Sequence, residues 1–257
     1  DVLPAAWETL TPLPDLALAA FIGAAGFFVA RLILLGNPPL ESGALGALLA
    51  SGMALHFTGD AQATSTFFTA AALILLVAAI QDGYRLAFVD ELTGLPGRRA
   101  LTMETMKLGS RYAVAMLDVD HFKKFNDTFG HDVGDQVLRM VASRMDRVNG
   151  GGKPFRFGGE EFTMLFPGKT REEAIPHLDA LRQSIQESGF TVRSRNRPRK
   201  KPDRPRKTHP PGRKVAVTIS IGVAERSDDH ATPDAVIKAA DQALYRAKKA
   251  GRNRVSV

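Results

Sequence analysis

Hydrophobic residues are concentrated in the N-terminal third of the chain, where three apolar runs follow one another. Leu16 to Leu35 contains one charge, Arg31, and is as long as a helix that crosses a bilayer core. Ala63 to Ile80 is a second run, without charge, and Ser42 to Thr58 is shorter and weaker. We therefore expect residues 1–83 to form a helical membrane region with two or three transmembrane segments. The alternative, buried helices of a soluble domain, would need a covering layer that the chain does not offer.

From residue 84 onward, short apolar stretches alternate with amphipathic ones. The pattern predicts strands over 111–119, 155–157, 162–166 and 215–223, and helices over 132–145, from Thr170 onward, and from Thr232 to about Gly251. Thr170 and Glu173 have the spacing of a capping box, although Pro176 could delay the start of that helix. The order of these elements predicts an α/β domain over residues 84–257, with helices packed against one sheet.

The formal charge of +7 comes from one segment. Residues 193–214 hold eleven Lys and Arg, five Pro and one acid, whereas the rest of the chain is slightly acidic. This arithmetic argues against nucleic-acid binding by the domain as a whole. We expect a mobile, basic, Pro-rich insertion, which is either a tolerated surface loop or a contact with the anionic inner leaflet of a membrane. The absence of Cys excludes disulfide scaffolds and thiolate metal sites.

Three acidic residues fall where the predicted strands end. Asp118 and Asp120 close a buried strand, and Glu160 lies in a Gly-Gly turn between two strands. If these strands are neighbours, the carboxylates converge at the rim of the sheet. Carboxylates without His or Cys make a hard-oxygen site suited to Mg²⁺ or Mn²⁺. That chemistry points to phosphoryl or nucleotidyl transfer, although paired acids at a strand end are often only solvated.

Five stretches together resemble the successive motifs of the GGDEF family. They are DELTGLPGRR (90–99), LDVDHFKKFNDTFGHDVGDQVL (117–138), FRFGGEEF (155–162), TISIGVA (218–224) and ADQALYRAKKAGRNRV (240–255). They occur in the order and spacing of the family and cover residues 90–255. The resemblance implies a palm-like α+β fold related to nucleotide cyclases. It also implies a diguanylate cyclase, which condenses two GTP into cyclic di-GMP across a homodimer and releases pyrophosphate.

The resemblance also assigns roles to individual residues. It implies that Asp118 and Glu160, helped by the main-chain carbonyl of Val119, hold two Mg²⁺ or Mn²⁺ ions per active site, and that Glu160 assists deprotonation of the 3′-hydroxyl. The substrate-binding residues that it implies are Asn126 and Asp135 at the guanine edge, His131 lining the site, Phe122 and Lys123 at the terminal phosphates, Gly158 and Gly159 beside the α-phosphate, and Lys248 and Arg252 on the β- and γ-phosphates.

Several of these residues also have ordinary structural explanations. Lys248 and Arg252, four apart on the predicted last helix, could be a solvated helix end that favours cations. Asp135 could be an acid in the first turn of a helix, and Asn126 a turn former. The competing function for the whole domain is a catalytically silent GGDEF domain that acts as a nucleotide receptor or scaffold.

One family motif is missing from the sequence. Many members carry Arg-x-x-Asp shortly before the Gly-Gly turn, where it binds product and inhibits the enzyme, but residues 149–152 of this chain are Asn-Gly-Gly-Gly. We therefore expect no product inhibition of that kind. The resemblance, together with the basic soluble part, implies a bacterial inner-membrane protein whose catalytic domain is cytoplasmic. It also makes GTP, membrane lipid and a second copy of the chain the expected partners.

Overall fold

Three helices make up the N-terminal part of the chain: α1 (Asp15–Leu35), α2 (Pro39–His56) and α3 (Ala61–Phe88). The computed structural model describes residues 11–36, 38–192 and 213–257. The chain divides into two compact units, one up to Ala87 and the other from Phe88 onward. Two of the described helices, α1 over Asp15–Leu34 and α3, are long and apolar enough to cross a membrane by length and composition, and an 18-residue window in each has a mean hydropathy of 2.1.

Close contacts join the helices of this unit. Nη2 of Arg31 lies 2.8 Å from Oε1 of Glu41 and links α1 to α2. A Cβ on Gly43 would lie 2.2 Å from the Cβ of Ala78, so α2 and α3 approach each other closely because this position carries no side chain. α3 extends beyond the apolar run Ala63–Ile80 and continues without a break to Phe88.

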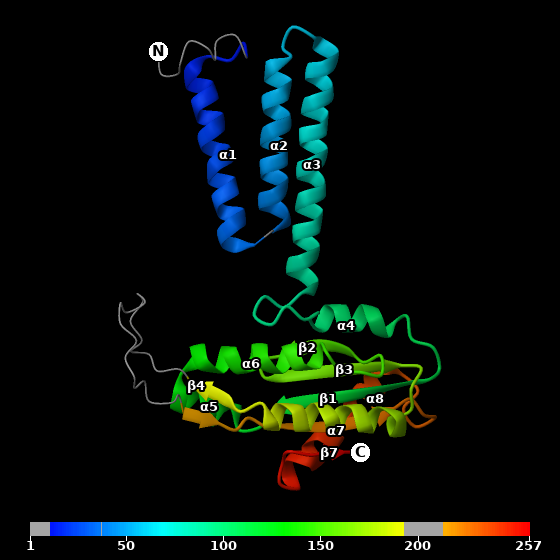
Figure 1. The fold of residues 1–257 in the computed structure, drawn as a ribbon. Helices are drawn as coiled ribbons and strands as arrows, with labels where there is room; N and C mark the ends of the chain where they lie inside the picture. The colour runs from blue at the N-terminus through cyan, green and yellow to red at the C-terminus, as the bar shows by residue number, and fades with distance from the viewer. Residues whose placement is uncertain (1–10, 37, 193–212) are drawn as a thin grey trace. The chain divides into compact units, whose positions relative to one another are not determined.

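The second unit is built on a five-stranded sheet with the order β2-β3-β1-β6-β7. Its strands are β1 (Tyr112–Val119), β2 (Lys153–Gly158), β3 (Glu161–Pro167), β6 (Ile219–Glu225) and β7 (Val255–Ser256). β1 pairs antiparallel with β3 and β6, and β6 pairs parallel with β7. A separate hairpin of β4 (Phe190–Val192) and β5 (Arg213–Val215) lies at one end of the domain (Figure 1).

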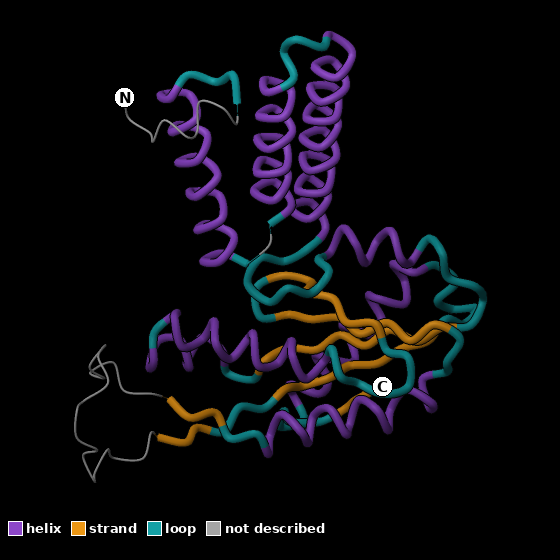
Figure 2. The backbone as a smooth tube through the Cα atoms, turned by 45° about the horizontal axis from the view of Figure 1, so that its top comes forward, coloured by secondary structure: helices purple, strands orange, loops and turns teal. Residues whose placement is uncertain are grey.

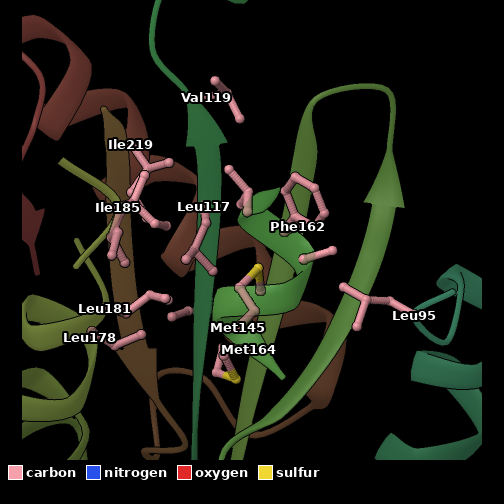
Figure 3. Close-up of a cluster of buried hydrophobic side chains, with 14 of the residues drawn as sticks. Leu95, Leu117, Val119, Met145, Phe162, Met164, Leu178, Leu181, Ile185 and Ile219 are labelled. Carbon is pink, nitrogen blue, oxygen red and sulfur yellow. The ribbon is translucent and has the colours of Figure 1, made fainter. Parts of the chain in front are cut away.

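Helices cover both faces of this sheet (Figure 2). Alternate residues of β1 point to opposite faces, and every one of them is buried. One face packs on α6 (His131–Met145) and α7 (Arg171–Glu187), and Figure 3 shows Leu117, Phe162, Met145 and Leu181 in this cluster. The other face packs on α4 (Arg98–Thr105) and α8 (Pro233–Lys249). Each large apolar side chain buried in this way contributes about 1.5–3 kcal/mol, so the two clusters hold the rim of the sheet in place.

Most of the predicted elements are confirmed, and their arrangement is an α/β fold with helices packed against one sheet, as their order predicts. The predicted helix at Thr170 begins at Arg171 with both hydrogen bonds of the capping box, and Pro176 lies inside it without delaying its start. The predicted strand over 215–223 is wrong at its start. Val215 pairs with Phe190 in the small hairpin, and β6 begins only at Ile219.

Among the described elements, five short ones were not predicted: α4, β4, β5, β7 and α5 (Phe122–Phe129). The basic insertion expected at 193–214 lies, apart from the first two residues of β5, outside the described residues.

Candidate active site

Asp118 lies near the C-terminal end of β1, opposite Glu161 of β3 and Ser220 of β6. It is 6% exposed, and its Oδ2 lies 2.8 Å from Nζ of Lys248 in α8. Burial raises the pKa of the Asp118 carboxyl, while the charges of Lys248 and Arg252 act in the opposite direction. The centre of the sheet rim therefore holds a carboxylate that is withdrawn from water and stabilised mainly by one cation.

Glu160 occupies the turn between β2 and β3, next to Asp118. Its main-chain oxygen accepts a hydrogen bond from the N–H of Val119 at 3.4 Å, which joins the turn to the end of β1. The pKa of Glu160 is raised by burial and then by the negative charge of Asp118. The charge of Asp118 acts on Glu160, so the structure brings these two carboxylates close together, as expected from the ends of the two strands.

Asp120 does not join this pair as the sequence led us to expect. Its carboxylate accepts hydrogen bonds from the hydroxyls of Thr218 and Ser220 and from the backbone N–H of Asn253. Within the residues that the structure describes, no group of three or more Asp, Glu or His lies close enough to hold a metal ion. The predicted cluster of three acids is therefore wrong, and the site contains the pair Asp118 and Glu160.

The prediction that Lys248 and Arg252 share one helix face is also wrong. α8 ends at Lys249, and Arg252 follows in a left-handed turn with a φ of 65°. Lys248 still contacts Asp118 directly, and the charge of Arg252 acts on the same carboxyl. Both cations therefore belong to the site, but one comes from the helix and the other from the loop after it.

The Gly158-Gly159 turn is supported by Arg156, which forms an ion pair with Asp90 that was not predicted from the sequence. Nη1 of Arg156 lies 2.7 and 2.8 Å from the two oxygens of Asp90, and its Nε and Nη2 donate to the carbonyl of Gly159. Gly159 has a φ of 52°, which glycine adopts without a steric penalty. No atom lies within 4 Å of where a Cβ on Gly158 or Gly159 would stand, so the turn is open to a ligand.

Two helices, α5 and α6, carry the remaining candidates. Phe122 is buried in the core, so only its backbone can reach a ligand, while Lys123 and His131 are exposed. Asn126 packs against Gly134, where a Cβ would lie 1.9 Å from Oδ1 of Asn126. That Oδ1 is buried without a hydrogen-bond partner, and Asp135, the residue after Gly134, is partly exposed. An orphaned polar atom beside a carboxylate is suited to a ligand with complementary donors and acceptors.

The residues fit a hard divalent cation. The carboxylates of Asp118 and Glu160 and the main-chain oxygen of Val119 are all oxygen donors of the kind that Mg²⁺ and Mn²⁺ prefer. Burial raises the pKa of both carboxyls, and the charge of Asp118 raises that of Glu160 further; a bound dication would offset these effects.

The chain is similar to one known protein family and to several known proteins. A family model described as "Diguanylate cyclase, GGDEF domain" matches residues 87–202 and 197–254. The response regulator PleD of Caulobacter vibrioides is 38% identical over 185 residues, which are 68% of this chain and 37% of PleD. Diguanylate cyclase DgcP of Pseudomonas aeruginosa is 36% identical over 186 residues, 69% of this chain and 25% of DgcP. The chain thus spans well under half the length of these curated relatives.

Solved structures match the fold as well. The coiled coil and GGDEF domain of DgcB from Caulobacter crescentus, in complex with c-di-GMP, matches with a TM-score of 0.66 and 31% identity over 77% of this chain and 99% of that one. The DgcB GGDEF domain alone matches with a TM-score of 0.57 and 35% identity over 66% of this chain and 95% of that one.

Proposed function

This chain belongs to the GGDEF domain family of diguanylate cyclases, and on that premise we propose that it condenses two molecules of GTP into cyclic di-GMP with release of pyrophosphate. The observation that carries the proposal is the pair of Asp118 and Glu160 at the sheet rim, faced by Lys248. Acidic ligands for a dication beside cations for phosphate form the arrangement that nucleotidyl transfer requires.

The acidic pair supplies the reaction centre. Asp118, Glu160 and the carbonyl of Val119 would hold two Mg²⁺ or Mn²⁺ ions, and such ions, when bound, stabilise negative charge on the α-phosphate and activate the attacking 3′-hydroxyl. Glu160 is the more exposed of the two carboxylates and, since its pKa is raised by burial and by Asp118, it is suited to accept the hydroxyl proton.

The cations and the turn bind the triphosphate. Lys248 and Arg252 would neutralise the β- and γ-phosphates, with Lys248 exchanging its contact with Asp118 for a phosphate oxygen. No side chain caps the N-terminus of α5, so the backbone N–H groups of Phe122 and Lys123 remain available for the terminal phosphates. Gly158 and Gly159 leave room for the α-phosphate.

The guanine base would be recognised by residues of α5 and α6. Asn126, through its orphaned amide oxygen, and Asp135 would bond the edge of guanine, and His131 would line the same pocket. A site built to hydrogen-bond one base discriminates strongly against another, because the unmatched polar groups are left unpaired.

The reaction needs two chains, since each active site holds one of the two GTP molecules. The DgcB structure with its coiled coil covers 77% of this chain, whereas the DgcB domain alone covers 66%. The additional coverage supports a coiled-coil contact through α3, the helix that precedes the catalytic unit. We therefore place the homodimer contact along the C-terminal half of α3. Two α3 helices paired in this way would hold the two catalytic units close together.

The membrane unit would anchor this dimer in the bacterial inner membrane. α1 and α3 provide the two candidate spans, and the basic composition after α3 favours a cytoplasmic catalytic unit. Lipid is then the partner of the apolar faces of these helices.

We also propose that product does not inhibit the enzyme through residues 149–152. These residues present no charged side chain, and Gly150 lies so close to His177 that a Cβ would stand 2.3 Å from its Nε2. Unchanged activity after addition of cyclic di-GMP would support this proposal. Inhibition that disappears when Asn149 is replaced would contradict it.

The deciding experiment measures pyrophosphate release and cyclic di-GMP formation by the full chain in lipid nanodiscs with GTP and Mg²⁺. Product from the wild type, loss of product in Glu160→Gln and full activity in Glu172→Gln, an exposed control on α7, would support the cyclase. Binding of GTP without any product in the wild type would instead favour a silent domain that acts as a nucleotide receptor or scaffold.

A further inference from the structure

Asp120 follows directly after β1 and has no assigned role, yet both oxygens of its carboxylate are fully engaged. Oδ1 accepts from the hydroxyl of Ser220 at 2.6 Å, and Oδ2 accepts from the hydroxyl of Thr218 at 2.7 Å. Oδ2 also accepts from the backbone N–H of Asn253 at 3.1 Å. The first two donors only attach Asp120 to the neighbouring strand, whereas the third reaches a segment 133 residues away.

That third donor belongs to a backbone conformation that needs support. Arg252 and Asn253 are consecutive residues with φ values of 65° and 46°, a left-handed region that L-residues other than glycine rarely adopt. Strained turns of this kind persist only when surrounding groups determine them. Asp120 holds the backbone of the turn, and the side chain of Asn253 is held separately by Arg182 and Gln186 of α7.

The backbone conformation of this turn sets the direction of the Arg252 side chain. α8 ends at Lys249, but the N–H of Arg252 still donates to the carbonyl of Ala247 at 3.0 Å, so the end of the helix holds the backbone of Arg252 while Asp120 holds that of Asn253. The left-handed turn keeps the charge of Arg252 close enough to Asp118 to act on its carboxyl. The direction of a Cβ depends on φ and ψ. If the turn adopted other φ and ψ angles, the Arg252 guanidinium would therefore point in a different direction.

We propose that Asp120 is a positioning residue that acts through Arg252. Its carboxylate fixes the Arg252–Asn253 turn through the N–H of Asn253, and thereby aims the Arg252 guanidinium at the triphosphate of the nucleotide. The inference rests on the proposed function, because it takes the ligand to be a nucleoside triphosphate at this site.

The test compares binding of GTP with binding of GMP by the full chain in nanodiscs at fixed Mg²⁺. In the wild-type background, Asp120→Ala is expected to reduce the preference for GTP over GMP about tenfold, as Arg252→Ala does. In the Arg252→Ala background, Asp120→Ala is expected to change that preference less than about twofold, because the group through which it acts is already gone.

Two further variants separate positioning from general stability. Asn253→Gly keeps the N–H and tolerates a positive φ, so it is expected to keep the preference for GTP. Asp120→Leu is similar in size, has no acceptor oxygen, and decides the question if Asp120→Ala does not fold. An unchanged GTP preference in both Asp120 variants, or an equal loss with and without Arg252, would overturn the inference.

Inorganic tripolyphosphate makes this result independent of the base. Weaker tripolyphosphate binding in Asp120→Ala, only where Arg252 is present, would support the inference. Binding that does not depend on Asp120 would overturn it. A wild-type chain that binds ATP as tightly as GTP would contradict the proposed function, and the tripolyphosphate comparison would still decide the role of Asp120.

Discussion

Nζ of Lys248 lies 2.8 Å from Oδ2 of Asp118, and this contact pairs a cation proposed to bind phosphate with a carboxylate proposed to bind metal. The side chain of Asp118 is 8% exposed and that of Lys248 is 31% exposed. Without nucleotide, Lys248 therefore compensates the buried charge of Asp118 and occupies one of the positions from which a metal ion would bind.

Replacing Lys248 should strengthen the binding of metal alone. Lys248→Met removes the competing cation, and since a hydrogen bond to a charged group is worth roughly 1.5–3 kcal/mol, we expect the affinity for Mn²⁺ without nucleotide to rise about tenfold. Mn²⁺ titration followed by electron paramagnetic resonance checks this in the full chain. The same variant should bind GTP more weakly.

Lys249→Met is the matched control, because Lys249 is exposed and lies over the ring of Tyr245 instead of at the site. Its Mn²⁺ affinity should equal that of the wild type. Equal affinities in all three proteins would show that Lys248 does not compete with metal.

Removing Asp90 should destabilise the catalytic unit. Asp90→Ala leaves Arg156, whose side chain is 13% exposed, without its bidentate partner, and we expect a loss of about 2 kcal/mol. Pulse proteolysis in urea measures this on the full chain. Glu91→Ala, at an exposed neighbouring position, should change the stability by less than about 0.5 kcal/mol.

The contribution of Asp90 should also depend on pH. Burial alone would raise the pKa of its carboxyl, but hydrogen bonds from Thr93 and Arg156 outweigh burial and lower the pKa below 3.8. A group whose pKa is lower in the folded state contributes stability above its unfolded pKa and loses it as the pH falls through the folded value. The stability difference between wild type and Asp90→Ala should therefore be constant from pH 5 to 8 and shrink below about pH 4. A difference that grows on acidification would contradict this assignment.

Gly222 should not tolerate a side chain. A Cβ there would lie 1.9 Å from the N of Leu244 and 2.2 Å from the O of Ala240. Both are backbone atoms of α8, which cannot move away by a change of rotamer. We expect Gly222→Ala to cost about 3 kcal/mol or to prevent folding, because β6 and α8 must then separate. Gly109→Ala, which would meet no atom within 4 Å, is the control and should be nearly neutral in the same proteolysis assay.

Gly134→Ala should separate substrate binding from stability. A Cβ at this position would displace the side chain of Asn126, so we expect the KM for GTP to rise about tenfold. The unfolding midpoint should stay the same or increase, since alanine is favoured over glycine within a helix by roughly 0.5–1 kcal/mol. Steady-state kinetics and urea unfolding of the same preparation check both parts. A rise in KM accompanied by an equal loss of stability would point to general damage instead.

The sequence predicted the main elements where a local pattern decides the structure. Thr170 and Glu173 are a signal of this kind, because the capping box satisfies the first N–H groups of α7 within four residues. Pro176 misled the prediction of the helix start. Proline has no N–H, so the hydrogen bond to the carbonyl of Glu172 is lost. Glu172 is exposed, and water can donate to that carbonyl instead.

The predictions that were wrong concern residues whose partners are distant in the sequence. Arg252 was assigned to the last helix because its spacing from Lys248 is helical, but it lies in a left-handed turn whose next residue, Asn253, donates its N–H to Asp120, 133 residues away. Arg156 and Asp90 both lie in recognised motifs, yet nothing in their local pattern shows that they pair across 66 residues.

The sequence by itself therefore determined the order of elements, the two apolar helices that could span a membrane, and the identity of the family, because each follows from periodicity or from motifs within short stretches. Only the tertiary structure decided that Asp118 and Asp120 have different surroundings and therefore different proposed roles. Asp118 and Asp120 are two residues apart and chemically identical, but Asp118 faces Lys248 and Glu160, whereas Asp120 is enclosed by donors from β6 and from the turn after α8. A carboxylate's role depends on the charges and donors around it, and these are brought together only by the folding of the sheet.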